Sequence, residues 1–435
     1  MFFMFFVQNA NAKDANYFHY HNLINRAETN FFLHENVDSA IYLYKKAFKN
    51  FDFVFAKDCI MAAQIAVYAK RNDDAVLFIN KGFEQGIIIE MLQPIKVFTN
   101  FLKDEKILQQ LKTNYPLLHK KYLARINVNM LRKITVAYYN DELNKVYSES
   151  YHPPYGNYIN GEYKENPVLE NKVLAKQLYD NYVDIRINNV NMIDSFARTI
   201  GFPGEKLTGI EQQYVEAGLS AELASAKKER VLKQPGLLSE LGYANEECKS
   251  RLDKLTSQQL DTILNGKNVP PKVKDYEYKY LKNTMVSGDI SDGKVFIILI
   301  HLTSTYCKLQ DLWMNAIKKG EVHPRDVACF YDASLKPDSG LRVEDREYKN
   351  KVNCKINKPY SNYFYLNYLV PYNKLKDTQL KGYNNPFAFV PLIDTKQTNE
   401  MRRALYMVDY GVDLAKNKYQ KEYGFKIRFG EFGQL

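Results

Sequence analysis

Residues Val295–Asp332, VFIILIHLTSTYCKLQDLWMNAIKKGEVHPRDVACFYD, decide the fold of the C-terminal half. The stretch begins as an unbroken apolar run and then places one histidine, His301, in the most hydrophobic surroundings of the chain. A polar group inside an apolar segment must be hydrogen-bonded, bound to a ligand or used chemically, because burying it unpaired costs a few kcal/mol. Gln310 and Asp332 follow at distances that indicate a helical hairpin. We therefore predict a helical core around His301, whose role is the main functional question.

Length and composition indicate an ordinary globular protein. The chain has 435 residues, 46% hydrophobic and 25% charged, which favours two or three domains with sizeable cores. The net charge of +10 is spread along the chain, and no nucleic-acid-binding motif accompanies it. We interpret the excess as a solvated lysine-rich surface and expect no nucleic-acid partner; binding of phosphate or of an acidic partner is the alternative.

The N-terminus favours an exported protein. Residues 1–7 are all apolar, and Ala10-Asn11-Ala12 has the small-x-small form of a signal-peptidase site, although no positive segment precedes them. We interpret residues 1–12 as a truncated signal peptide, which predicts a periplasmic or secreted location. The alternative is an apolar N-terminus on a cytoplasmic protein. No segment has the roughly 18 uninterrupted apolar residues that a membrane-spanning helix needs, so none is expected.

Residues 13–150 have helical periodicity throughout, in two pairs of helices whose residues Ala40 and Ala75 recur about 35 positions apart. After them we expect helices at Glu90–Phe101 and Asp104–Thr113 and a long helix from Pro116 to about Tyr147. The pairs resemble tetratricopeptide repeats, with Glu28 standing where that repeat has a small residue. The matching positions are Phe31, Ala40, Tyr44, Ala47, Ala63 and Ala75.

This resemblance implies a helical solenoid that binds a protein partner on its concave face. We expect the partner to be anchored by aromatic side chains of the inner helices. The expected anchors are Tyr17, Tyr20, His21 and Tyr68.

Residues 151–166 contain two prolines, two glycines and several asparagines, so we place a linker there. Residues 167–435 form the predicted C-terminal domain, which is helical with minor β structure and carries a helical insertion at 210–287. Its expected helices include Pro167–Asn188, Val190–Ile200 and a last helix at Thr398–Lys421, and a short strand or hairpin is expected at Asn362–Tyr368.

Several short motifs of this domain resemble, in the same order, an uncharacterised bacterial domain family. They are Gly201-Phe202-Pro203, Gly209, His301, Gln310, Gly320-Glu321-Val322, Asp332, Pro391-Leu392-Ile393-Asp394 and Arg402-Arg403. The chain departs from that family at Ile300, where glutamine is usual, and at Ala333, where arginine is usual. The family has no established activity, so the resemblance implies a fold and no reaction.

The sequence lacks HExxH, a glycine-rich phosphate loop and a G-x-S-x-G elbow, and we expect no metal and no cofactor. His301 with Gln310, Asp332 or Asp394, and Arg402 or Arg403, would suit general acid–base catalysis. Two other interpretations stay open. His301 is a buried, hydrogen-bonded histidine while an arginine–aspartate pair fastens the last helix, or the cluster forms a non-catalytic ligand pocket.

The predicted fold is therefore mainly α: a tetratricopeptide-like solenoid followed by a helical domain. The predicted function is that of a protein-binding or scaffold component of an exported bacterial assembly, in which the helical-repeat face binds the partner. The alternative is a histidine-dependent hydrolase or transferase.

Overall fold

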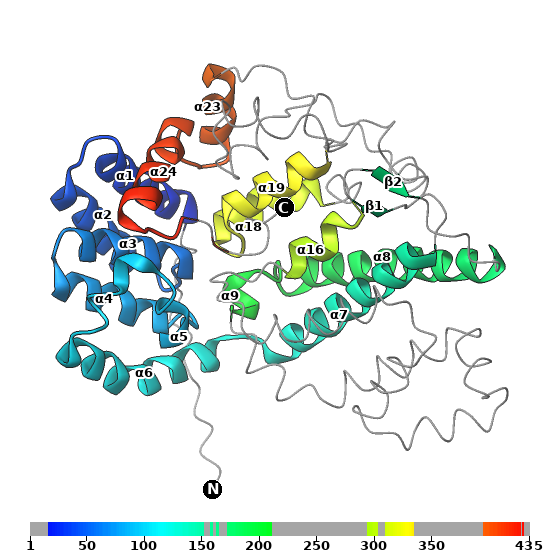
Figure 1. Ribbon diagram of the computed structural model, residues 1–435, viewed down its shortest axis with the longest axis horizontal. Coiled ribbons are helices and arrows are strands. Elements are labelled where there is room, and N and C mark those ends of the chain that lie inside the picture. The colour runs from blue at the N-terminus through cyan, green and yellow to red at the C-terminus, as the bar shows by residue number, and fades with distance from the viewer. Residues whose placement is uncertain are drawn as a thin grey trace, which may run out of the picture.

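The computed structural model describes residues 16–151, 157–159, 162–164, 172–210, 294–302, 309–334, 395–427 and 429 (Figure 1). Within these ranges the protein is mainly helical, as the sequence predicts. The N-terminal segment 1–12, the expected strand at Asn362–Tyr368 and all of the expected insertion except Ile210 lie outside the described residues. None of the described helices is both long and apolar enough to cross a bilayer.

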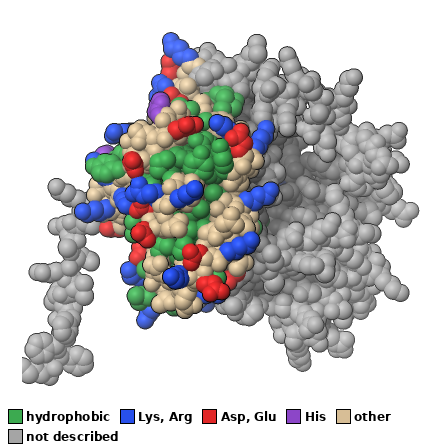
Figure 2. Space-filling view, turned by 60° about the vertical axis from the view of Figure 1, so that its left-hand side comes forward, with side chains coloured by type: hydrophobic (Ala, Val, Ile, Leu, Met, Phe, Trp, Pro, Cys, Tyr) green, Lys and Arg blue, Asp and Glu red, His purple; other side chains and the backbone are tan. Residues whose placement is uncertain are grey.

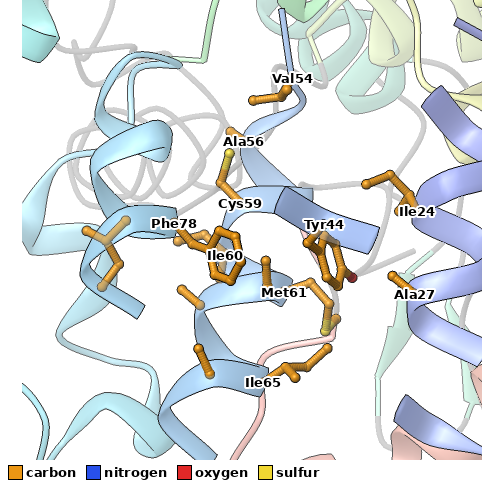
Figure 3. Close-up of a cluster of buried hydrophobic side chains, with 14 of the residues drawn as sticks. Ile24, Ala27, Tyr44, Val54, Ala56, Cys59, Ile60, Met61, Ile65 and Phe78 are labelled. Carbon is orange, nitrogen blue, oxygen red and sulfur yellow. The ribbon is translucent and has the colours of Figure 1, made fainter. Parts of the chain in front are cut away.

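The first four helices form two packed pairs: α1 (Tyr17–Phe32) with α2 (Val37–Asn50), and α3 (Ala56–Tyr68) with α4 (Asn72–Phe83). Asparagine side chains cap α1 and α2, because Oδ1 of Asn16 accepts from the Phe18 amide and Oδ1 of Asn36 accepts from the Ser39 amide. Fully buried alanines let the helices approach closely while larger apolar side chains fill the remaining space. Figure 3 shows this core, with Ile24, Tyr44, Ile60 and Phe78 contributed by the four helices.

The helices after α4 differ from the prediction. Pro94 divides the first expected helix into α5 (Ile89–Leu92) and the 3₁₀ helix η1 (Lys96–Phe98). Next comes α6 (Glu105–Arg125), which contains Pro116 in its interior.

The predicted single helix beginning at Pro116 is wrong, because the chain breaks after Arg125 and resumes as α7 (Val128–Tyr151). Asn127 explains the break: its backbone amide donates to the Leu207 carbonyl at 2.7 Å, and its Oδ1 accepts from the Met130 amide. A contact with a distant segment and a local cap therefore place this boundary.

The expected linker contains a small hairpin. Strands β1 (Asn157–Ile159) and β2 (Glu162–Lys164) pair antiparallel, with Tyr158 opposite Tyr163. The two expected helices that follow are one continuous helix, α8 (Lys172–Thr199).

The C-terminal core is built from α7, α8 and three further helices. These are α16 (Lys294–Ile300), α18 (Gln310–Lys319) and α19 (Pro324–Ser334). Trp313 is buried at the centre of this core against the rings of Phe202, Phe296 and Phe330. The short helix α9 (Glu205–Thr208) lies beside α7.

The last expected helix is two helices, α23 (Thr395–Ala404) and α24 (Tyr410–Tyr423). They are separated by a turn in which Tyr406 has a φ of 60° and the Met407 amide donates to the Arg402 carbonyl. Helix α24 packs against α1, and its side chains Val412 and Tyr419 belong to the same core as the repeat helices (Figure 1). The C-terminal end of the chain therefore completes the N-terminal core.

Candidate functional site

His301 lies at the end of the apolar helix α16, which is buried beside α7, α8 and α19. Its Nδ1 pairs with Oδ2 of Asp141, a residue of α7. The Asp141 side chain is fully buried, whereas 11% of the His301 side chain is exposed. The Asp141 carboxylate therefore binds one ring nitrogen of His301, while a small part of the His301 side chain stays exposed.

Arg186 of α8 joins this pair. Its Nη1 donates to the backbone carbonyl of His301 at 2.8 Å, and its guanidinium lies over the Tyr182 ring at 4.4 Å. The Arg186 side chain is fully buried, and neither its Nε nor its Nη2 has a hydrogen-bond partner among the described residues. Buried guanidinium N–H groups favour an anionic partner, because leaving them unpaired costs free energy.

The three side chains combine the elements of proton-transfer chemistry. When the imidazole is neutral and Nδ1 donates to Asp141, Nε2 is the ring nitrogen that carries the basic lone pair. A buried carboxylate also stabilises the imidazolium that such a transfer creates. The arrangement can therefore orient a general base beside an arginine.

Asp141 and Arg186 are partners of His301 that the sequence analysis does not name. Gln310 and Asp332 lie in α18 and α19, but their side chains, and all of Asp394, are outside the described residues. Arg402 is fully buried and pairs with Asp413 of α24. Its Nε donates to the Val408 carbonyl at 2.6 Å. This arginine–aspartate pair fastens the last helix, as the structural interpretation expects, and a catalytic role for Arg402 stays a prediction.

Asp141 and Arg186 were missed because each is one charged residue in a long helix rich in polar residues. No local motif distinguishes them. Only the packing of α7 against α8 and α16 selects them from the other charged residues.

Asp413 is the centre of a buried ionic network between α1, α19, α23 and α24. Arg325 binds both of its carboxylate oxygens at 2.7 and 2.9 Å, Arg402 binds one of them, and Lys416 lies at 3.2 Å. Burial raises the pKa of Asp413, but Arg325, Arg402 and Lys416 outweigh burial and hold it well below its usual range. Lys416 also pairs with Glu28 at 2.8 Å. This pairing accounts for a glutamate on the buried face of α1.

A second buried polar group lies between α1, α3 and α19. The Tyr20 hydroxyl donates to Oδ2 of Asp58 at 2.8 Å, and burial raises the pKa of Asp58 to about 7. The His21 and His323 rings meet edge to face at 5.4 Å. Burial lowers the pKa of His21 to about 3 and that of His323 well below its usual value, so both are neutral near pH 7.

These contacts correct the expected docking anchors. Tyr17, Tyr20 and His21 are 2%, 0% and 2% exposed. The Tyr17 and Tyr20 rings pack against Phe51, and the His21 ring meets His323 at the start of α19. A side chain on Gly320 would meet the Tyr17 ring, so glycine is required at this left-handed helix end (φ 68°). Tyr68, 36% exposed, is the one of the four anchors that reaches the surface.

Two of the motifs, Gly201-Phe202-Pro203 and Gly320-Glu321-Val322, meet in space. Oε2 of Glu321 accepts from the Phe202 amide at 3.0 Å, and a side chain at Gly204 would collide with the Glu321 carbonyl. Phe202 packs on Trp313 at a ring distance of 5.1 Å. These residues join α8 to the end of α18, which is a structural role.

The described residues contain no group of three His, Cys, Asp or Glu side chains placed to hold a metal ion. No protein-family model, curated protein or solved structure matches the chain. Both family resemblances therefore stay predictions.

Proposed function

We propose that the protein binds a protein partner through an exposed aromatic pair, formed by Tyr68 at the end of α3 and Tyr423 at the end of α24. The two rings lie 4.8 Å apart, and the residues are 36% and 40% exposed. Half-exposed tyrosines are common anchors of protein interfaces, because they bury much area and lose little conformational freedom.

The pair rests on a buried aromatic base. Tyr419 lies 5.5 Å from Tyr68 and 5.4 Å from Tyr423, and behind it are Phe31 and Phe425. Partial burial and a hydrogen bond with Tyr423 raise the pKa of Tyr68. A partner would therefore meet two rings that are already ordered, which lowers the entropic cost of binding.

The surface of the N-terminal helices supports the same function. Figure 2 views the side of the molecule that holds these helices and shows hydrophobic side chains gathered near its centre with charged side chains around them. An apolar centre with a charged rim is the usual composition of a protein interface. The proposal places this interface in an exported bacterial assembly, on the support of the apolar residues 1–7 and the Ala10-Asn11-Ala12 motif.

Site-specific photo-crosslinking tests the proposal. A photoreactive phenylalanine analogue replaces Tyr68, Tyr423 or, as the matched control, Tyr42, a 63% exposed tyrosine of α2. We expect one partner to crosslink from positions 68 and 423 and not from position 42.

The affinity for that partner, once it is purified, gives a second test. Tyr68→Ala and Tyr423→Ala should each weaken binding by about tenfold or more, as interface hot spots do, while Tyr42→Ala leaves affinity unchanged. Equal crosslinking from all three positions, or unchanged affinity in Tyr68→Ala, would contradict the proposal.

The pairing of His301 with the buried Asp141 favours a second candidate, a histidine-dependent hydrolase or transferase acting on an anionic substrate near Arg186. On this hypothesis His301→Gln and Asp141→Asn each slow the hydrolysis of an activated ester or phosphate ester by roughly 10²- to 10⁴-fold. His34→Gln, which changes an exposed histidine, is the control. Turnover that is absent in the wild type, or equal in all variants, rejects this candidate.

A further inference from the structure

We propose that the cavity between α1 and the turn joining α23 to α24 binds a small organic anion, with Arg26 holding its carboxylate or phosphate group. The cavity has a volume of about 510 Å³. This is within the usual range of small-molecule sites, roughly 300–1,000 Å³. Its lining does not include Tyr68, Tyr423, His301 or the side chains of the ionic network.

One wall of the cavity is a polar stripe of α1. His19, Asn22 and Arg26 follow each other at helical spacing and line the same cavity, and all three are exposed. Below the stripe the lining is apolar, with Leu23 from α1 and Val412 from α24. A ligand would therefore meet hydrogen-bond donors at the rim and an apolar floor beneath them.

The opposite wall is held in place by specific contacts. Tyr406 has a φ of 60°, a conformation that residues with a side chain rarely adopt. Its backbone carbonyl accepts from Nδ2 of Asn25 at 2.8 Å, and its ring stacks on Phe18 at 4.0 Å with the planes 1° apart. The wall is thus fixed to α1 before any ligand enters, which favours binding.

The charges of the lining favour an anion. Arg403 is neutralised by Asp409, to which it donates from both Nε and Nη2. The Arg26 side chain has no ion pair among the described residues, so the N–H donors of its planar guanidinium remain available to a ligand. Carboxylates and phosphates are the groups that match this fork, and the apolar floor suits a ligand with a hydrocarbon body.

Three probes of one shape test the inference by titration followed in two-dimensional NMR: phenylacetate, phenyl phosphate and the uncharged phenylacetamide. We expect saturable binding of at least one anion, with the largest shifts at Arg26 and Asn22, and little binding of phenylacetamide. The anion that binds more strongly identifies the recognised group as carboxylate or phosphate.

Arg26→Gln should weaken binding of that anion by about tenfold, and Lys46→Ala, which removes an exposed cation on α2, should not. Binding that persists in Arg26→Gln, equal binding of phenylacetamide, or the absence of saturable binding by either anion would overturn the inference.

Discussion

Asp413→Asn is expected to lower the free energy of unfolding by about 3–5 kcal/mol near neutral pH, because it leaves buried cations without their central counterion. The substitution keeps the size of the side chain but removes the charge that faces Arg325, Arg402 and Lys416. Arg402 is fully buried and has no other carboxylate partner among the described residues. The loss is measured from urea unfolding followed by circular dichroism.

Asp409→Asn is the matched control, because Asp409 also pairs with an arginine of α23, but that arginine is exposed. Exposed ion pairs contribute little to stability, so this variant should unfold close to the wild type. A loss of the same size in both variants would show that Asp413 is not the centre of the network.

The loss caused by Asp413→Asn should itself depend on pH. The pKa of Asp413 is depressed in the folded protein, so its stabilisation is full above the unfolded pKa, about 3.9, and is lost as the pH falls through the folded value. The difference between wild type and variant should therefore be constant from about pH 7 to 5 and shrink below about pH 4. Urea unfolding curves recorded across this pH range measure how the difference in unfolding free energy changes. A difference between wild type and Asp413→Asn that grows on acidification would contradict the prediction.

Trp313→Ala is expected to cost about 3–5 kcal/mol of unfolding free energy, the usual range for removing a large aromatic side chain from a core. The Trp313 ring is buried and lies 5.1 Å from Phe202 and 5.6 Å from Phe330, so its removal leaves a cavity among aromatic side chains. Those neighbours come from α19 and from the turn after α8, which limits how far the site can collapse. Urea unfolding by circular dichroism measures the effect.

Met314→Ala, the adjacent position on α18, is the control, because that side chain is 40% exposed. Its effect should stay within about 0.5 kcal/mol, as for most surface substitutions. Comparable losses in Trp313→Ala and Met314→Ala would mean that the aromatic cluster is not the centre of the C-terminal core.

The apolar pattern predicted most of the helices and the burial around His301. It did not predict the helix boundaries that depend on contacts between distant segments. The break between α6 and α7 depends on the hydrogen bond from Asn127 to Leu207, and no pattern within 116–147 contains that information. The break between α23 and α24 likewise depends on a turn that Asn25 and Phe18 hold from α1.

The candidate site shows the same division. The sequence indicated that His301 needs a polar partner, because burial of an unpaired imidazole is costly. It could not single out Asp141, since charged residues recur on every long helix and only packing brings this one to the ring. The expected anchors Tyr17, Tyr20 and His21 are buried for a related reason: Phe51, Phe55 and His323 pack against them, which no pattern within α1 indicates.

The sequence by itself determined that this protein is mainly helical, that its N-terminal helices pair through small residues, and that one histidine ends an apolar helix. These properties follow from local periodicity and residue size, which act over a few turns of chain. Only the tertiary structure decided that α24 completes the first core, that Arg325, Arg402 and Lys416 bind Asp413 while Glu28 pairs with Lys416, and which tyrosines remain at the surface. These properties depend on contacts between different helices, where burial makes each charge require a partner that no local pattern names.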